Sequence, residues 1–73
     1  MRYDMKIYDR VKLKTDKYKE HGIRKGDIGT ILEDYGDGYF EVDFSDDKGN
    51  TIALFAFPKS EMNQIVNKLY AGE

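Results

Sequence analysis

The sequence predicts a mainly β protein, a small closed barrel of about five antiparallel strands with a short C-terminal helix. Three observations support this fold class. Apolar and polar residues alternate over 10–14 and 39–45, which is typical of half-buried strands. Clusters of glycine and aspartate, which favour tight turns, separate the apolar segments. The chain has 73 residues, so residues 1–73 are predicted to form one domain with its core at about 9–57, and without Cys no disulfide can reinforce it.

The first predicted strand is followed by a polar loop. Residues 9–15 form this strand, with Val11 and Leu13 inward and basic side chains outward. The preceding residues 1–8 form either a short leading strand or an ordered arm. Residues 16–22 are polar and lack periodicity, so they are predicted to form a loop.

A glycine-bearing turn leads from this loop into the next strand. Gly22 and Gly26 flank the turn, because glycine readily adopts the positive φ that a tight reversal needs. Ile23 is expected to be buried beneath the turn. The next strand covers residues 27–35, where Gly29 indicates a bulge or a sharp bend. A bend of this kind helps a sheet to curl into a barrel.

A hairpin connects this strand to the following one. Residues 36–38, Gly-Asp-Gly, are predicted to form its turn. The strand over 39–45 places Phe40, Val42 and Phe44 inward, because neighbouring side chains of a strand point to opposite faces. This strand therefore supplies much of the predicted core.

The C-terminal part is predicted to contain a strand and then a helix. After a turn at 46–50, residues 51–57 are apolar at nearly every position, which indicates a strand covered on both faces. Pro58 ends that strand, since proline cannot extend the ladder. Ser60 is a suitable N-cap for a helix over about 60–70 that closes one end of the barrel. The apolar stripe of this helix consists of Met62, Ile65, Val66 and Leu69.

Basic and acidic residues are distributed unevenly along the chain, although the net charge is only −2. Residues 1–26 carry nine basic and four acidic side chains, whereas 27–73 carry three basic and ten acidic ones. This asymmetry either creates a bipolar surface that attracts a charged partner or sets basic and acidic strands side by side, where they pair. The longest apolar run, 52–58, is far shorter than a membrane span, so we expect a cytoplasmic protein without a membrane partner.

The sequence contains no recognisable catalytic or metal-binding motif. His21 is the only histidine and lies in a polar loop without a nucleophile beside it. Ser45 and Ser60 lack the glycine-flanked elbow of serine hydrolases. Residues 43–50 superficially resemble a calcium loop, but the turn glycine is displaced and Leu54 replaces the bidentate glutamate. We therefore expect no enzymatic activity, no catalytic residues, no metal and no cofactor.

Two sets of side chains are candidates for binding a partner. Tyrosines and carboxylates between residues 35 and 47 could bind a basic protein, because tyrosine offers a large, stiff contact area and carboxylates attract cations. Basic residues around Tyr18 could bind nucleic acid, because lysine and arginine can contact phosphates while the tyrosine ring stacks on a base. The alternative is that the tyrosines only cover a small barrel. The protein-binding set is Tyr35, Asp37, Tyr39, Glu41, Asp43, Asp46 and Asp47, and the nucleic-acid-binding set is Lys12, Lys14, Lys17, Tyr18, Lys19, Arg24 and Lys25.

Three segments of the chain resemble SH3-like barrels, including the KOW modules of ribosomal and transcription proteins. They resemble more closely a family of short bacterial proteins called a domain of unknown function (DUF4926), over about residues 9–57. The segments that carry both resemblances are Asp9-x-Val11-x-Leu13, Gly22-Ile23-x-Lys25-Gly26-Asp27-x-Gly29-Thr30-Ile31 and Tyr39-x-Glu41-Val42-x-Phe44.

This resemblance implies an SH3-like barrel that acts as a binding module. Some relatives look like cytoplasmic partners of toxins or nucleases, which implies an immunity or antitoxin role. Our leading hypothesis is a non-enzymatic protein that binds and neutralises a basic toxin or nuclease. The alternatives are a KOW-like module that binds nucleic acid or the ribosome through the basic set, and a structural subunit that packs through an unpaired strand edge.

Overall fold

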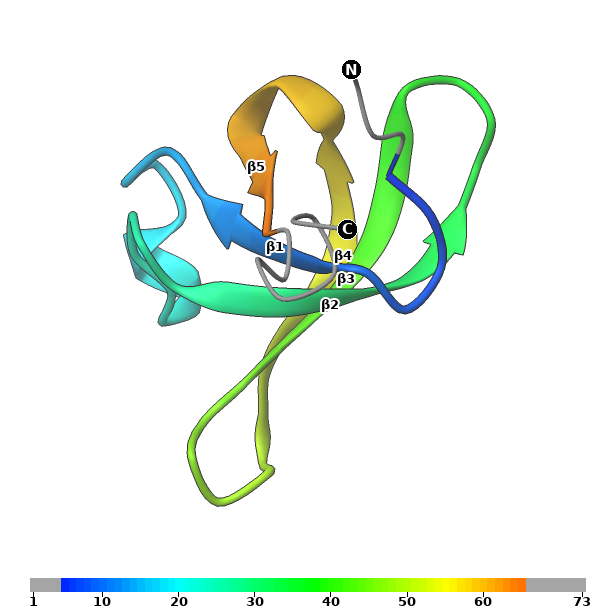
Figure 1. Cartoon of the computed structure of the whole chain (residues 1–73). Coiled ribbons are helices and arrows are strands. Elements are labelled where there is room, and N and C mark those ends of the chain that lie inside the picture. The colour runs from blue at the N-terminus through cyan, green and yellow to red at the C-terminus, as the bar shows by residue number, and fades with distance from the viewer. Residues whose placement is uncertain (1–4, 66–73) are drawn as a thin grey trace.

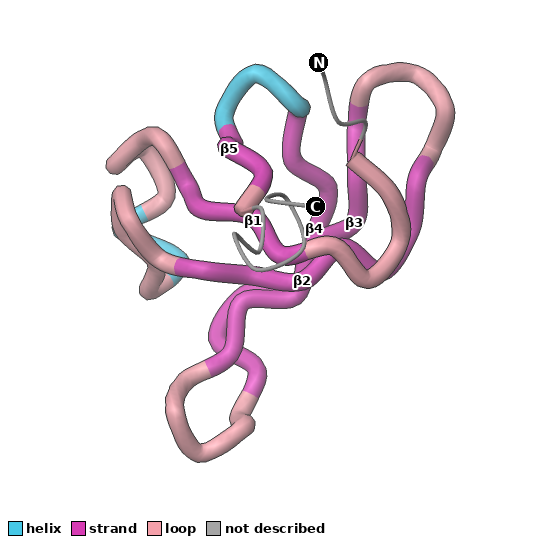
Figure 2. The backbone as a smooth tube through the Cα atoms, viewed as in Figure 1, coloured by secondary structure: helices cyan, strands magenta, loops and turns pink. Residues whose placement is uncertain are grey.

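The computed structural model describes residues 5–65. They form five β-strands and two 3₁₀ turns, and no α-helix occurs among them. In chain order the elements are β1 (Arg10–Leu13), η1 (Lys19–His21), β2 (Ile28–Asp34), β3 (Tyr39–Ser45), β4 (Thr51–Pro58), η2 (Lys59–Glu61) and β5 (Met62–Gln64). Figures 1 and 2 show that the strands curl around a common centre and that the β3–β4 hairpin projects from the body.

The strands form one antiparallel sheet in the order β4-β3-β2-β1-β5, so β4 and β5 are its edges. The central strand β2 pairs with β1 on one side and with β3 on the other. The predicted mainly β fold with five antiparallel strands is confirmed. Among residues 5–65, no helix is long and apolar enough to cross a membrane.

The core lies on the inward face of the curled sheet, where the predicted alternation is confirmed. Polar side chains separate the buried Phe40, Val42 and Phe44 along β3. Phe44 and Phe57 meet edge to face, with ring centroids 5.2 Å apart. Burying one large apolar side chain contributes about 1.5–3 kcal/mol, so this cluster dominates the stability of so small a domain. The buried core consists of Val11, Leu13, Ile23, Ile31, Phe40, Val42, Phe44, Ala53, Phe57 and Met62.

The two predicted turns that flank β2 are confirmed. Gly22 and Gly26 have φ angles of +87° and +97°, and Ile23 between them is completely buried. At the other end of β2, Tyr35 N–H donates to Tyr39 O at 3.1 Å across the 36–38 turn. Both turns bring the chain back onto the sheet, so that β2 pairs with its neighbours on either side.

Gly29 does not form a bulge, one of the two features predicted for it. It pairs in regular register with Phe44, whereas the irregular pairing of β2 lies further along, between Ile31 and Glu33. A Cβ atom at Gly29 would lie 2.7 Å from a Val42 methyl carbon and 2.9 Å from the ring of Phe44. Glycine is required here because side chains of β3 fill the space that a larger residue would need.

The prediction that 51–57 is covered on both faces is wrong. β4 is an edge strand that is buried on its inward face, where Ala53 and Phe57 join the core. Ile52 and Leu54 keep 43% and 46% of their surface exposed. An apolar run is typical of a doubly covered strand, but it does not reveal an edge position, which depends on the order of the strands.

The predicted helix over about 60–70 is wrong in the part that the structure describes. After the single turn η2, the chain forms β5 and pairs with the edge of β1, so that Met62 lies opposite Leu13. Met62 is buried as its apolar character requires, but it lies in a strand. Pairing with an open strand edge satisfies backbone groups of both strands and outweighs the local helix propensity. Val66 and Leu69 lie outside the described residues.

The N-terminal residues within the described range form an ordered arm, one of the two alternatives that the sequence left open. Tyr8 N–H donates to Ile31 O at 2.6 Å, which ties the arm to the middle of β2. Met5 packs against the core. The carbonyl oxygen of Asp9 in turn accepts the N–H of Ile31 at 2.9 Å, so two backbone bonds join the chain before β1 to β2 without adding a strand.

Candidate binding surfaces

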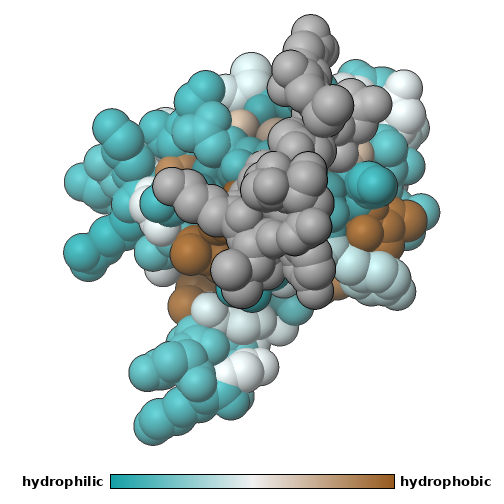
Figure 3. Space-filling view, in the orientation of Figure 1, coloured by the Kyte–Doolittle hydropathy of each residue, from teal (hydrophilic) through white to brown (hydrophobic). Residues whose placement is uncertain are grey.

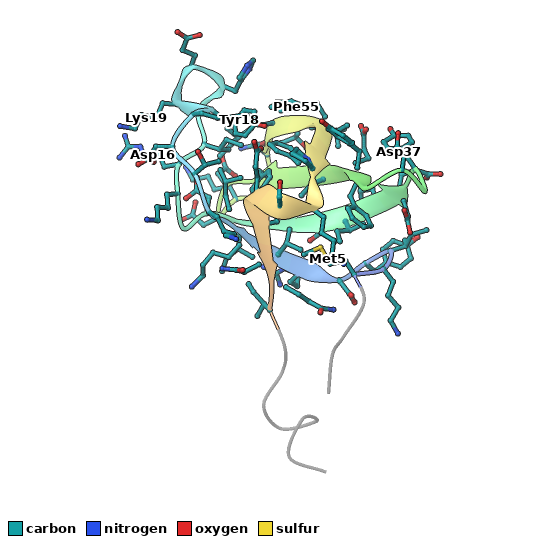
Figure 4. The ribbon with its side chains drawn as sticks, turned by 90° about the horizontal axis from the view of Figure 1, so that it is seen from above. Met5, Asp16, Tyr18, Lys19, Asp37 and Phe55 are labelled. Carbon is teal, nitrogen blue, oxygen red and sulfur yellow. The ribbon has the colours of Figure 1, made fainter. Side chains whose placement is uncertain are left out.

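The loop between β1 and β2 is held against the sheet by Tyr18. Its ring meets Phe57 edge to face at a centroid distance of 4.9 Å and lies 5.6 Å from the ring of Phe55. Its hydroxyl donates a hydrogen bond to Glu61 in η2, and Lys17 Nζ lies 2.5 Å from the other carboxylate oxygen of Glu61. Figure 4 shows Tyr18 and Phe55 next to one another. The loop therefore covers the inward side of the edge strand β4.

These contacts change the protonation of both partners. Burial, together with the hydrogen bond to Glu61, raises the pKa of Tyr18 to about 12. Burial alone would raise the pKa of Glu61, but the bonds from Lys17 and Tyr18 outweigh it, so this pKa lies below its usual value. At neutral pH the Tyr18 hydroxyl is thus protonated and Glu61 is ionised, and the loop stays attached.

The structure brings together only part of the predicted nucleic-acid-binding set. Lys17 Nζ lies 5.5 Å from the centroid of the Tyr18 ring, and the ring also contacts Phe55 and Phe57. Tyr18 is therefore not an open platform for stacking on a base. Lys12 and Lys14 are exposed at β1. The remaining cations of the set line one open hollow together with Asp16; they are Lys19, Arg24 and Lys25.

The predicted protein-binding set begins at the loop between β2 and β3. The Tyr35 hydroxyl donates to Glu41 Oε1 at 2.6 Å, and this bond is the main reason why the pKa of Tyr35 is raised. Tyr35 and Tyr39 keep 51% and 45% of their surface exposed. Glu33 lies opposite Glu41 across the β2–β3 pair, and two carboxylates in this relation repel each other. This end of the sheet therefore carries concentrated negative charge beside two accessible rings.

Two of the predicted acidic residues stabilise turns. Asp37 Oδ1 accepts Tyr39 N–H at 3.1 Å, and Asp46 Oδ1 accepts Asn50 N–H at 2.8 Å. The bond from Asn50 is the main reason why the pKa of Asp46 lies below its usual value. Asp46 and Asp47 lie in the hydrophilic β3–β4 hairpin at the bottom of Figure 3, about 20 Å along β3 from Asp37. The predicted protein-binding set therefore does not form one continuous patch. Within residues 5–65, no three histidine or carboxylate side chains lie close enough together to hold a metal ion.

The outward face of β4 carries exposed apolar residues that the sequence reasoning missed. Leu54 lies opposite Asp43, and Ala56 lies opposite Glu41, in the β3–β4 register. Both β4 side chains are exposed, so an apolar row borders the acidic row. No sequence signal distinguishes this row, because β4 is apolar on both faces and only the strand order shows which face is open. We call the combined surface the acidic face; it consists of Tyr35, Tyr39, Glu41, Asp43, Leu54 and Ala56.

Comparison with known proteins gives the family of the chain. A family model described as Domain of unknown function (DUF4926) matches residues 7–64. The chain belongs to this family. The match covers all five strands that residues 5–65 of this DUF4926 protein form, and it confirms the resemblance seen in the sequence. Neither the curated proteins nor the solved structures gave a match. Since the family description names no activity, the function of this DUF4926 protein has to be inferred from its surfaces.

Proposed function

We propose that this DUF4926 protein is a non-enzymatic binding module that holds a basic protein on its acidic face. The observation that carries the proposal is the pairing of accessible tyrosine rings, Tyr35 and Tyr39, with carboxylates that form no ion pair within residues 5–65. Tyrosine is enriched at protein interfaces because it buries a large area at a small entropic cost. Unpaired carboxylates beside such rings add specificity for a cationic surface.

We also infer that the curled sheet is an SH3-like barrel. The inference is supported by the strand order β4-β3-β2-β1-β5 and by η2, which connects the two edge strands. The interior of so small a barrel is filled by its own side chains, so a partner has to bind on the outside. The acidic face lies on this outer surface, over β3 and β4.

The charge distribution of the acidic face favours a basic partner. Glu41 lies opposite Glu33, and Asp43 follows on the same face of β3. Lysine or arginine side chains of a partner would relieve the repulsion between these carboxylates. Leu54 is 46% exposed opposite Asp43 and offers an apolar contact at the border of the carboxylate row. Specific protein interfaces combine apolar contacts with polar and charged ones, and these two adjacent rows offer both.

The partner class that we propose is a basic toxin or nuclease, which the protein would neutralise in the cytoplasm as an immunity or antitoxin protein. Proteins that act on nucleic acid expose lysine and arginine for contact with phosphates. An acidic face that covers such a surface competes directly with the nucleic acid. Charge complementarity and the exposed tyrosines support this role.

The variant Asp43→Lys tests the proposal. The partner is captured from a lysate of the source cells on immobilised wild-type protein, and its affinity is then measured by calorimetry with purified variants. Glu20→Lys is the matched control, because Glu20 is exposed in η1 and gives the same charge change outside the acidic face. We expect Asp43→Lys to weaken binding by about tenfold or more, and Glu20→Lys by less than about threefold. Equal losses in the two variants, or no loss in Asp43→Lys, would contradict the proposal.

A further inference from the structure

We propose that the loop between β1 and β2 contains a binding site for a phosphate group. Lys19, Arg24 and Lys25 line one open hollow with Asp16. Within residues 5–65, none of these three cations lies within ion-pair distance of a carboxylate. The hollow is separate from the acidic face, so this inference does not depend on the proposed protein-binding function. Figure 4 shows Asp16 and Lys19 together at one side of the molecule and Asp37 at the opposite side.

Hydrogen bonds hold the backbone of the hollow in shape. Asp16 Oδ1 accepts the N–H of Lys25 at 2.9 Å, which joins the beginning of the loop to its end. Asp27 Oδ2 accepts the N–H of Arg24, also at 2.9 Å. Between these points, Tyr18 anchors the loop to the sheet. Because the loop is already ordered, an anion can bind without the entropic cost of arranging the backbone first.

The charges of the hollow match a phosphate dianion. Its three cationic side chains and one carboxylate leave two net positive charges. The carboxylate of Asp16 is already engaged with the backbone of Lys25, which limits its competition for the cations. The guanidinium of Arg24 can pair with two phosphate oxygens at once, and lysine ammonium groups act as mobile point charges. Glu20, next to Lys19 in the chain, does not line the hollow.

Two sources can supply the phosphate group, a free phosphate ion and the backbone of a single-stranded nucleic acid. The free ion would contact the hollow alone. The hollow is open, so a strand can also cross it. In both cases, arginine and lysine side chains bind the oxygens of a phosphate group.

NMR titration of the full chain with inorganic phosphate, at an ionic strength held constant with chloride, is the first arm of the test. We expect saturable shifts in the backbone amide signals of Lys19, Arg24 and Lys25, and small shifts elsewhere. The second arm measures the anisotropy of a fluorescein-labelled oligothymidylate over a series of salt concentrations. Higher affinity for the oligonucleotide, with steep salt dependence, identifies a strand as the source, and equal affinity for both probes identifies the free ion.

Two double variants with the same charge change provide the matched control. Arg24→Gln with Lys25→Gln removes two charges from the hollow, whereas Lys12→Gln with Lys14→Gln removes one from β1 and one from the residue directly after it. All four side chains are exposed, so both variants are expected to fold, which circular dichroism checks. We expect the first to weaken binding of the probe by about tenfold or more and the second by less than about threefold. Equal losses in both, or no saturable shift at the hollow, would overturn the proposal.

Discussion

Two tyrosine–glutamate hydrogen bonds in this protein involve the same residue types and have different consequences. Tyr18 donates to Glu61 across a sequence separation of 43 residues, in a part-buried contact between a loop and η2. Tyr35 donates to Glu41 across a separation of 6 residues, and that contact lies on the surface. The first bond joins segments that are distant in the chain, and the second only orients neighbours within one hairpin.

The difference shows how burial separates a structural tyrosine from one available to a partner. The ring of Tyr18 is surrounded by Phe55, Phe57 and Lys17, so its contact area is already used within the chain. The ring of Tyr35 remains 51% exposed although its hydroxyl is bound. A satisfied hydroxyl on an exposed ring is preorganised for an interface, because the side chain loses little freedom on binding.

The largest expected effect is a difference in stability between Tyr18→Ala and Tyr35→Ala. Tyr18→Ala removes the edge-to-face contact with Phe57 and leaves the loop unanchored, so we expect the free energy of unfolding to fall by about 2–3 kcal/mol. Tyr35→Ala removes an exposed ring, and we expect a loss of about 0.5 kcal/mol or less. Urea unfolding measures both. Similar losses in the two variants would show that burial does not distinguish these tyrosines.

The next effect is a loss of stability at alkaline pH that depends on Tyr18. The pKa of Tyr18 is raised from 10.0 to about 12 in the folded protein, so the folded state retains this proton more strongly than the unfolded state. The resulting stabilisation is complete below pH 10 and is lost as the pH rises from about 10 through about 12. Tyr18→Phe should remove this part of the pH dependence.

The matched control for this pH effect is Tyr35→Phe. The pKa of Tyr35 is also raised, mainly by the hydrogen bond to Glu41, but its ring lies on the surface. We expect Tyr35→Phe to reduce the alkaline loss of stability less than Tyr18→Phe does. The measurement is the urea midpoint of each variant as a function of pH between 9 and 12. The assignment to Tyr18 would fail if both variants kept the full wild-type slope.

The smallest effect concerns Lys17, which pairs with the same carboxylate as Tyr18. Its side chain is 60% exposed, so solvent screens the pair with Glu61. We expect Lys17→Gln to lower the free energy of unfolding by about 0.5 kcal/mol, and by less when salt is added. Lys12→Gln is the control, because Lys12 is exposed and forms no ion pair within residues 5–65. A loss above about 1.5 kcal/mol would mean that the ion pair, and not the tyrosine ring, anchors the loop.

The candidate sites were predictable only in part from the sequence. Tyr35, Tyr39, Glu41 and Asp43 were selected because tyrosines and carboxylates cluster there, and the structure places them on one outer surface. Asp37 and Asp46 belong to the same clusters, yet their carboxylates accept backbone N–H groups in turns. The row formed by Leu54 and Ala56 was not predictable, because its exposure results from β4 being an edge strand.

The sequence by itself determined the local features of this protein. The alternation of Phe40, Val42 and Phe44 and the turn around Ile23 follow from side-chain direction and glycine conformation, which depend only on neighbouring residues. The tertiary structure alone decided that Met62 continues the sheet instead of a helix, that β4 has an open face, and that Tyr18 is anchored while Tyr35 is accessible. Each of these depends on which strands become neighbours, and that order is set by the sum of many long-range contacts.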